Sequence, residues 1–130
     1  MSTSPGDDLP AEPALHELVG SWLPIPDVAD RLGVPLSAVR RMVEDRILLA
    51  LRVGDRGILQ VPEKFLGADG PLAALRGTFT VLSDGGMTDE EAVRWLFTPD
   101  PTLPVDGAPI DAIIGGFKTE VRRRAMEQAF

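Results

Sequence analysis

Residues 25–66 decide the fold and read IPDVADRLGVPLSAVRRMVEDRILLALRVGDRGILQVPEKFL. Pro26 suits the first turn of a helix, and Gly33 ends that helix because glycine adopts a positive φ at little cost. Apolar residues at positions i, i+3, i+7 and i+11 then predict one face of a second helix: Leu36, Val39, Val43 and Ile47. The pattern therefore predicts two helices joined by a tight turn.

A β-hairpin is predicted directly after these helices. Residues 48–53 have the composition of a strand, residues 54–57 (Gly-Asp-Arg-Gly) that of a hairpin turn, and residues 58–61 that of the returning strand. Pro62 ends the hairpin, and residues 63–66 start a brief helix that packs Phe65. Two helices, a tight turn and a two-stranded wing together predict a winged helix-turn-helix.

The second half of the chain has a helical pattern. Pro71 is expected to open a helix that ends at Gly85-Gly86, and Thr88 with Glu91 forms the capping-box spacing at the start of the next. Four prolines make residues 98–109 a rigid connector. A last helix is expected over residues 117–129.

The N-terminal part is predicted to be a flexible acidic tail over residues 1–19, because its first 13 residues are polar and rich in proline. Residues 14–19 are compatible with one or two amphipathic turns. The predicted fold class is thus mainly α, with a winged helix-turn-helix over residues 20–66 and a small helical C-terminal domain over residues 70–130.

Composition excludes most enzyme and metal chemistry. The chain has 130 residues, 44% apolar and 25% charged, which is typical of one globular domain. It has no cysteine and one histidine, His16, so neither a thiol nucleophile nor a Cys/His metal site is expected. Since no nucleophile, base or ligand set emerges, we predict no enzyme activity, no metal and no cofactor.

The sequence also predicts a cytoplasmic, nucleoid-associated protein with no membrane partner. No apolar run approaches the roughly 18–20 residues of a membrane span. The first eight residues are acidic, whereas a secretory signal begins with basic residues.

Charge is distributed unevenly along the chain. Residues 1–30 contain six acidic residues and no Lys or Arg. Residues 31–66 contain seven basic and four acidic residues, and residues 67–130 contain six basic and ten acidic residues. The middle third therefore has a net charge of +3 within a chain of net charge −7, and only this part is expected to attract phosphate.

The candidate DNA-binding residues lie on the second helix and the wing. Arginine hydrogen-bonds a guanine edge or phosphate, and a hydroxyl near a helix start meets phosphate. The predicted set is Ser37, Arg40, Arg41 and Glu44 on the helix, with Arg52 and Arg56 on the wing. The alternative is a solvated helix face, on which Glu44 and Asp45 offset the arginines at i+4.

A second basic cluster, Arg122 to Arg124, is interpreted as a solvated helix face, because three consecutive residues spread over about 300° of a helix.

Two sets of motifs resemble known families. The run from Ile25 to Arg41, with Arg52-Val53-Gly54, Val61-Pro62 and Phe65, is similar to the small winged helix-turn-helix domains of excisionases and the MerR group. Leu82-Ser-Asp-Gly-Gly, the run from Glu91 to Pro101, and Val121 to Ala125 resemble a family of actinobacterial winged-helix DNA-binding proteins with a small helical C-terminal domain.

This resemblance implies a DNA-binding regulator whose N-terminal tail is the target of a serine/threonine kinase, which makes Thr3 and Ser4 candidate phosphorylation sites. The predicted function is sequence-specific binding of double-stranded DNA, with the second helix in the major groove and the wing on the backbone. The alternative is a protein-interaction module, similar to the partner-binding domains of antitoxins, that has lost DNA binding.

Overall fold

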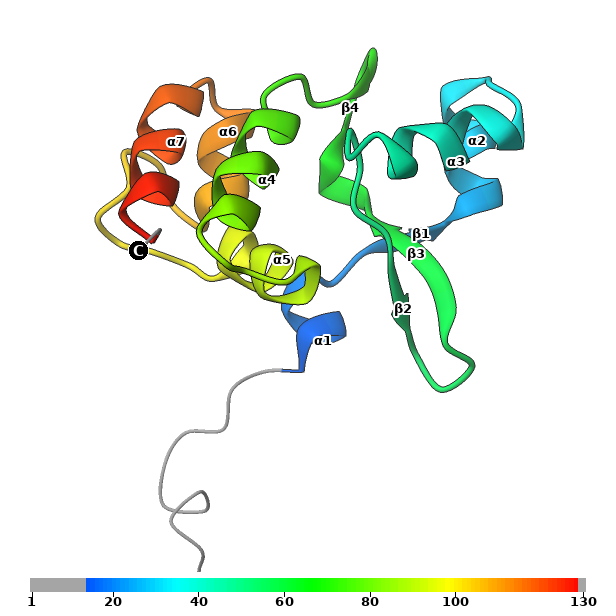
Figure 1. Ribbon diagram of the computed structural model, residues 1–130, viewed down its shortest axis with the longest axis horizontal. Coiled ribbons are helices and arrows are strands. Elements are labelled where there is room, and N and C mark those ends of the chain that lie inside the picture. Colours follow the sequence, from blue (N-terminus) through cyan, green and yellow to red (C-terminus); the bar gives the residue numbers. More distant parts are fainter. Residues whose placement is uncertain (1–13, 129–130) are drawn as a thin grey trace, which may run out of the picture.

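The computed structural model describes residues 14–128 and consists of two packed halves (Figure 1). One half contains α2 (Ile25–Leu32), α3 (Leu36–Glu44), β2 (Leu51–Val53) and β3 (Ile58–Pro62). The other contains α4 (Leu75–Asp84), α5 (Asp89–Phe97), α6 (Pro109–Ile114) and α7 (Lys118–Glu127). The predicted mainly α fold, a winged helix-turn-helix with a helical C-terminal part, is confirmed.

The helix-turn-helix forms where the sequence predicts it. Pro26 lies in the first turn of α2, and Gly33 ends this helix in the left-handed conformation with φ 67°. Val28 and Val39 are fully buried and are part of the hydrophobic core, into which α2 and α3 pack. α3 ends at Glu44 because Arg46 adopts a positive φ of 59°, so Ile47 lies beyond the helix rather than on its apolar face.

The wing is a β-hairpin in a three-stranded antiparallel sheet. β2 and β3 pair with Val53 opposite Ile58, and residues 54–57 form the predicted turn. A short strand that the sequence did not reveal, β1 (Trp22–Pro24), pairs with the other edge of β3. The first strand is shorter than predicted, because Leu48 and Leu49 are both buried in the core instead of alternating between two faces.

Two expectations for the flanks need correction. The predicted tail of residues 1–19 is too long, since α1 (Leu15–Val19) is a helix in which Leu15 and Val19 are buried. This helix lies next to α5 (Figure 1). Pro71 does not open a helix, because it pairs with Leu66 in a small hairpin formed by β4 (Leu66–Gly67) and β5 (Gly70–Pro71), and α4 begins only at Leu75. The rest of the predicted tail, residues 1–13, lies outside the described residues.

The helical half agrees with its sequence signals. Thr88 and Glu91 form the predicted capping box, with the Glu91 amide donating to Thr88 Oγ1 at 3.2 Å and the Thr88 amide donating to Glu91 Oε1 at 3.0 Å. The connector is non-helical from Thr98 until α6 begins at Pro109. Over the described part of the chain, no helix is both long and apolar enough to cross a membrane.

One hydrophobic core joins both halves. The short 3₁₀ helix η1 (Glu63–Phe65) places Phe65 between them, fully buried as the sequence predicts. Its ring centroid lies 5.4 Å from that of Phe79 on α4 and 5.7 Å from that of Phe97 on α5. The helical half therefore packs directly against the end of the wing's second strand.

Candidate nucleic-acid interface

The predicted helix residues share an exposed surface of α3. Ser37, Arg40, Arg41 and Glu44 are all exposed, whereas Val39 on the other side of the helix is fully buried. No side chain caps the N-terminus of α3, where the N-cap residue is Pro35 with φ −63°. The first turn of α3 is therefore open to a partner.

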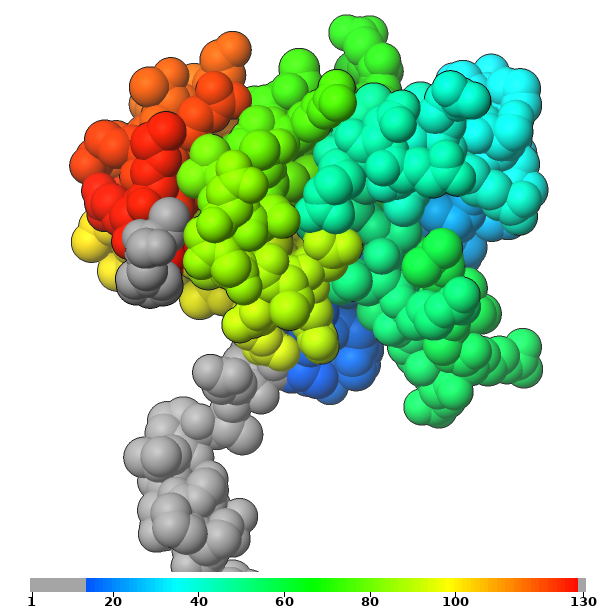
Figure 2. Space-filling view, viewed as in Figure 1, coloured from blue at the N-terminus to red at the C-terminus, as the bar shows by residue number. Residues whose placement is uncertain are grey.

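The two wing arginines, Arg52 and Arg56, are also exposed, and Arg52 is hydrogen-bonded to the hairpin turn. Gly54 and Gly57 have φ of 79° and 60°, which an L-residue with a side chain adopts only at a cost, and the Gly57 amide closes the turn on the Gly54 carbonyl at 3.1 Å. Arg52 Nη1 donates to the Gly57 carbonyl at 3.2 Å. Arg56 lies in the turn itself and is exposed. The wing as a whole stands out from the body of the molecule (Figure 2).

Other basic residues of the winged half are committed to ion pairs. Arg31 bonds Glu63 at 2.7 Å, Arg46 bonds Asp89 at 2.8 Å, and Lys64 bonds Asp111 at 2.7 Å. Four arginines of this segment have no acidic partner among residues 14–128, namely Arg40, Arg41, Arg52 and Arg56. These are the four arginines predicted from the sequence as site residues, and of the four only Arg52 has a hydrogen bond recorded within the described chain, to the Gly57 carbonyl.

The two acids on which the solvated-face alternative rests form no ion pair with the α3 arginines. Glu44 and Asp45 stand four residues after Arg40 and Arg41, yet in residues 14–128 neither carboxylate pairs with either guanidinium. The two acids balance the charge of the two arginines in sum, but they do not occupy the hydrogen-bond donors of the guanidinium groups.

An apolar groove lies between α3 and the wing. It has a volume of about 450 Å³, and its lining includes Leu36, Val43 and Ile58 together with Arg40. The sequence had placed Leu36 and Val43 on a buried face opposite Arg40, but Leu36 is 37% exposed and Val43 only half-buried. The reason is that α3 is short and packs deeply only around Val39, so its edges stay open.

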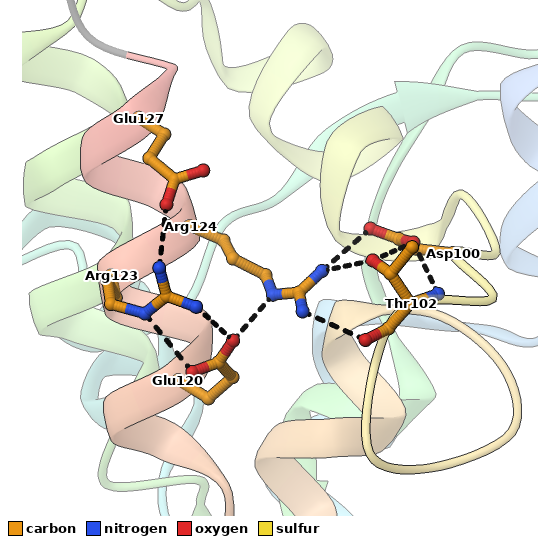
Figure 3. A network of polar contacts seen from close by, with 6 residues as sticks. All are labelled: Asp100, Thr102, Glu120, Arg123, Arg124 and Glu127. Carbon is orange, nitrogen blue, oxygen red and sulfur yellow. Dashed lines mark hydrogen bonds and ion pairs between the residues drawn. The ribbon is translucent and has the colours of Figure 1, made fainter.

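The second basic cluster is mostly structural (Figure 3). Arg124, whose side chain is only 20% exposed, bonds Glu120 and Asp100 and also donates to the Thr102 carbonyl at 2.9 Å, which ties α7 to the proline-rich connector. Arg123 pairs with Glu120 and Glu127, and its hydrogen bonds lower the pKa of Glu120 below the usual value. The interpretation of all three arginines as a solvated face was therefore wrong for Arg124.

No metal site is found in the part of the chain that the structure describes, where no group of three or more His, Cys, Asp or Glu side chains converges. The candidate phosphorylation sites Thr3 and Ser4 lie outside the described residues.

Comparison with known proteins identifies both halves. Residues 10–66 match the family model described as "DNA-binding protein Rv2175c, wHTH domain", and residues 72–129 match the "Rv2175c C-terminal domain of unknown function". A relative from Mycobacterium tuberculosis named "DNA-binding protein Rv2175c" is 37% identical over 138 residues, which cover 96% of this chain and 88% of the relative. The chain belongs to the Rv2175c family.

The fold of Rv2175c itself agrees with the one described above. The NMR structure of Rv2175c matches with a TM-score of 0.76 and 35% identity, and the match covers 85% of this chain and 82% of that one. All six predicted site residues fall within the part of the chain that matches the Rv2175c winged-helix model. The predicted membership of an actinobacterial winged-helix family is confirmed.

Two apolar residues of this surface, Leu36 and Ile58, were not predicted from the sequence of this Rv2175c family member. Leu36 and Ile58 line the groove beside Arg40, but their apolar type suggested only core positions. The position of Leu36 directly after Pro35 was the available signal, because the first residue of a helix projects away from the body of that helix.

Arg56 at the tip of the wing is expected to supply phosphate affinity without regard to sequence. Arg56→Ala should weaken binding to selected and random duplexes alike and reduce the slope of log K against log salt by about 0.9, the value for one phosphate contact. Arg76→Ala, which removes an exposed arginine from α4, is the matched control and should leave both unchanged. A loss confined to the selected duplex would mean that Arg56 reads bases instead.

Proposed function

We propose that this chain binds double-stranded DNA sequence-specifically and regulates transcription. The observation that carries the proposal is the set of four arginines on α3 and the wing that have no acidic partner in residues 14–128. Three basic residues of the same half, Arg31, Arg46 and Lys64, form ion pairs with acidic side chains, whereas these four arginines do not. Their positive charge therefore remains available on this surface. Membership of a family named for a DNA-binding protein supports the same function.

The proposed geometry inserts the N-terminal part of α3 into the major groove, where residues at the start of such a helix contact base edges. Arg40 and Arg41 are the candidates for bidentate bonds to guanine or for phosphate contacts, and Ser37 for a hydroxyl bond near the helix start. Glu44, one turn further, is the candidate to accept a hydrogen bond from the amino group of cytosine. Arg52 and Arg56 on the wing bind the adjacent phosphates.

This function requires no reaction, metal or cofactor, and we assign the chain to the cytoplasm in association with the nucleoid. The competing function, a protein-interaction module without DNA binding, requires a partner protein whose carboxylates meet these four arginines. A DNA-binding assay at several salt concentrations distinguishes the two functions, because phosphate contacts make the affinity for DNA fall steeply as the salt concentration rises.

The direct test replaces both helix arginines. Arg40→Ala/Arg41→Ala should cost about 1–3 kcal/mol of binding free energy on a duplex selected from a random pool, because a guanine contact or two phosphate contacts are lost. The measurement is fluorescence anisotropy at several salt concentrations, with circular dichroism to verify the helix content.

The control removes two positive charges from the helical half, at the exposed residues Arg76 and Lys118. Arg76→Ala/Lys118→Ala should retain the full affinity. Unchanged affinity of the α3 double variant, with its helix content intact, would contradict the proposed role of α3.

We also propose that residues 1–13 weaken DNA binding and that a serine/threonine kinase acts on Thr3 or Ser4. This segment contains Asp7, Asp8 and Glu12 and no Lys or Arg. It joins the described chain next to Leu15 and His16, which line a hollow of about 330 Å³ together with Arg52 on the wing. Its charge is therefore tethered beside the proposed interface, and each phosphate adds about −1.5 to −2.

Deletion of residues 1–13 tests this second proposal. The truncated chain should bind DNA more tightly than the full chain at low salt, and the gain should shrink as salt screens the charges. Equal affinities of the two proteins across the whole salt titration would show that the segment has no such effect.

A further inference from the structure

The groove between α3 and the wing exposes apolar surface at the centre of the proposed interface. Leu36 at the first position of α3 is 37% exposed, and Ile58 at the first position of β3 is 44% exposed. Ile25, Val43 and Leu59 complete its apolar lining, within a volume of about 450 Å³. Exposed apolar surface of this kind, rimmed by charge, is typical of a binding site.

The charged rim indicates which partner the groove accepts. Arg40 stands four residues after Leu36, on the same face of α3, and lines the groove together with Glu44. The two side chains form no ion pair with each other, and Arg40 has no acidic partner within the described chain. A ligand that fills the groove must therefore offer hydrogen-bond acceptors to Arg40, a donor to Glu44 and an apolar group to Leu36.

The major groove of DNA offers both on neighbouring base pairs. Guanine presents two acceptors, N7 and O6, and the apolar group on this edge of the bases is the 5-methyl group of thymine. We infer that the groove formed by Leu36 and Ile58 reads thymine methyl groups, next to a base or phosphate held by Arg40. The inference rests on the proposed DNA binding and adds a preference for thymine to it.

A second copy of the chain fits this surface less well than DNA does. Symmetric pairing of two such grooves would place the same residues of both copies against each other, so the only carboxylate of the groove lining that it offers to Arg40 is Glu44 of the other copy. Arg41, Arg52 and Arg56 also have no acidic partner in residues 14–128. A DNA duplex supplies phosphates to these three arginines as well as base edges to the groove.

The test compares one duplex with and without thymine methyl groups. The duplex is selected from a random pool and then synthesised either with thymine or with deoxyuridine, which lacks only the 5-methyl group. The wild-type chain should lose about fourfold in affinity for each methyl group that enters the groove. Leu36→Ala should show a smaller difference in affinity between the two duplexes than the wild type, because its main loss is on the thymine form.

Two further variants make this comparison specific. Ile58→Ala should reduce the thymine preference independently of Leu36, so the test does not depend on one variant folding. Ile114→Ala removes an exposed apolar side chain from α6, 52% exposed, and should keep the full preference.

Equal affinity of the wild type for both duplexes, with salt-dependent binding intact, would overturn the thymine inference and leave the DNA-binding proposal standing. A selected consensus without thymine would overturn it as well. If no duplex binds at any salt concentration, the proposed function itself fails.

Discussion

The buried ring of Phe65 is the contact on which the arrangement of this molecule depends. It follows β3 directly and stacks at a tilt against Phe79 and Phe97, so the wing and the helical half share one core. Two ion pairs flank this junction: Lys64 bonds Asp111 on α6, and Arg46, just after α3, bonds Asp89 at the start of α5. The helical half therefore contacts both the segment that follows α3 and the end of the wing.

The sequence predicted those parts of the fold that local chemistry determines. Gly33 ends α2 and the capping box of Thr88 starts α5 through interactions within a few residues, so both boundaries followed from spacing. β1 was missed because a strand of three residues has too few positions for an alternating pattern, and its pairing partner is about 40 positions away. Pro71 was assigned to a helix because proline suits both a first helical turn and a strand edge, and only its pairing with Leu66 distinguishes them.

For the candidate site too, features set by local sequence could be predicted, and features set by long-range contacts could not. Residue type and helical spacing led to the prediction of Arg40 and Arg41, and their place before and within the predicted hairpin turn led to that of Arg52 and Arg56. That these arginines are unpaired could not be predicted, because the acids that neutralise their neighbours come from 32 to 47 positions away along the chain. The exposure of Leu36 was equally hidden, since a periodic apolar stripe indicates which face packs but not how far the packing extends along a short helix.

The most direct test of the central claim, that DNA engages α3 and the wing, is an NMR titration of the ¹⁵N-labelled full chain with a selected duplex. If DNA engages α3 and the wing, amide signals of residues 36–44 and 52–58 shift or broaden, and those of α6 and α7 move little. Perturbations confined to the helical half, or no perturbation at low salt, would contradict it.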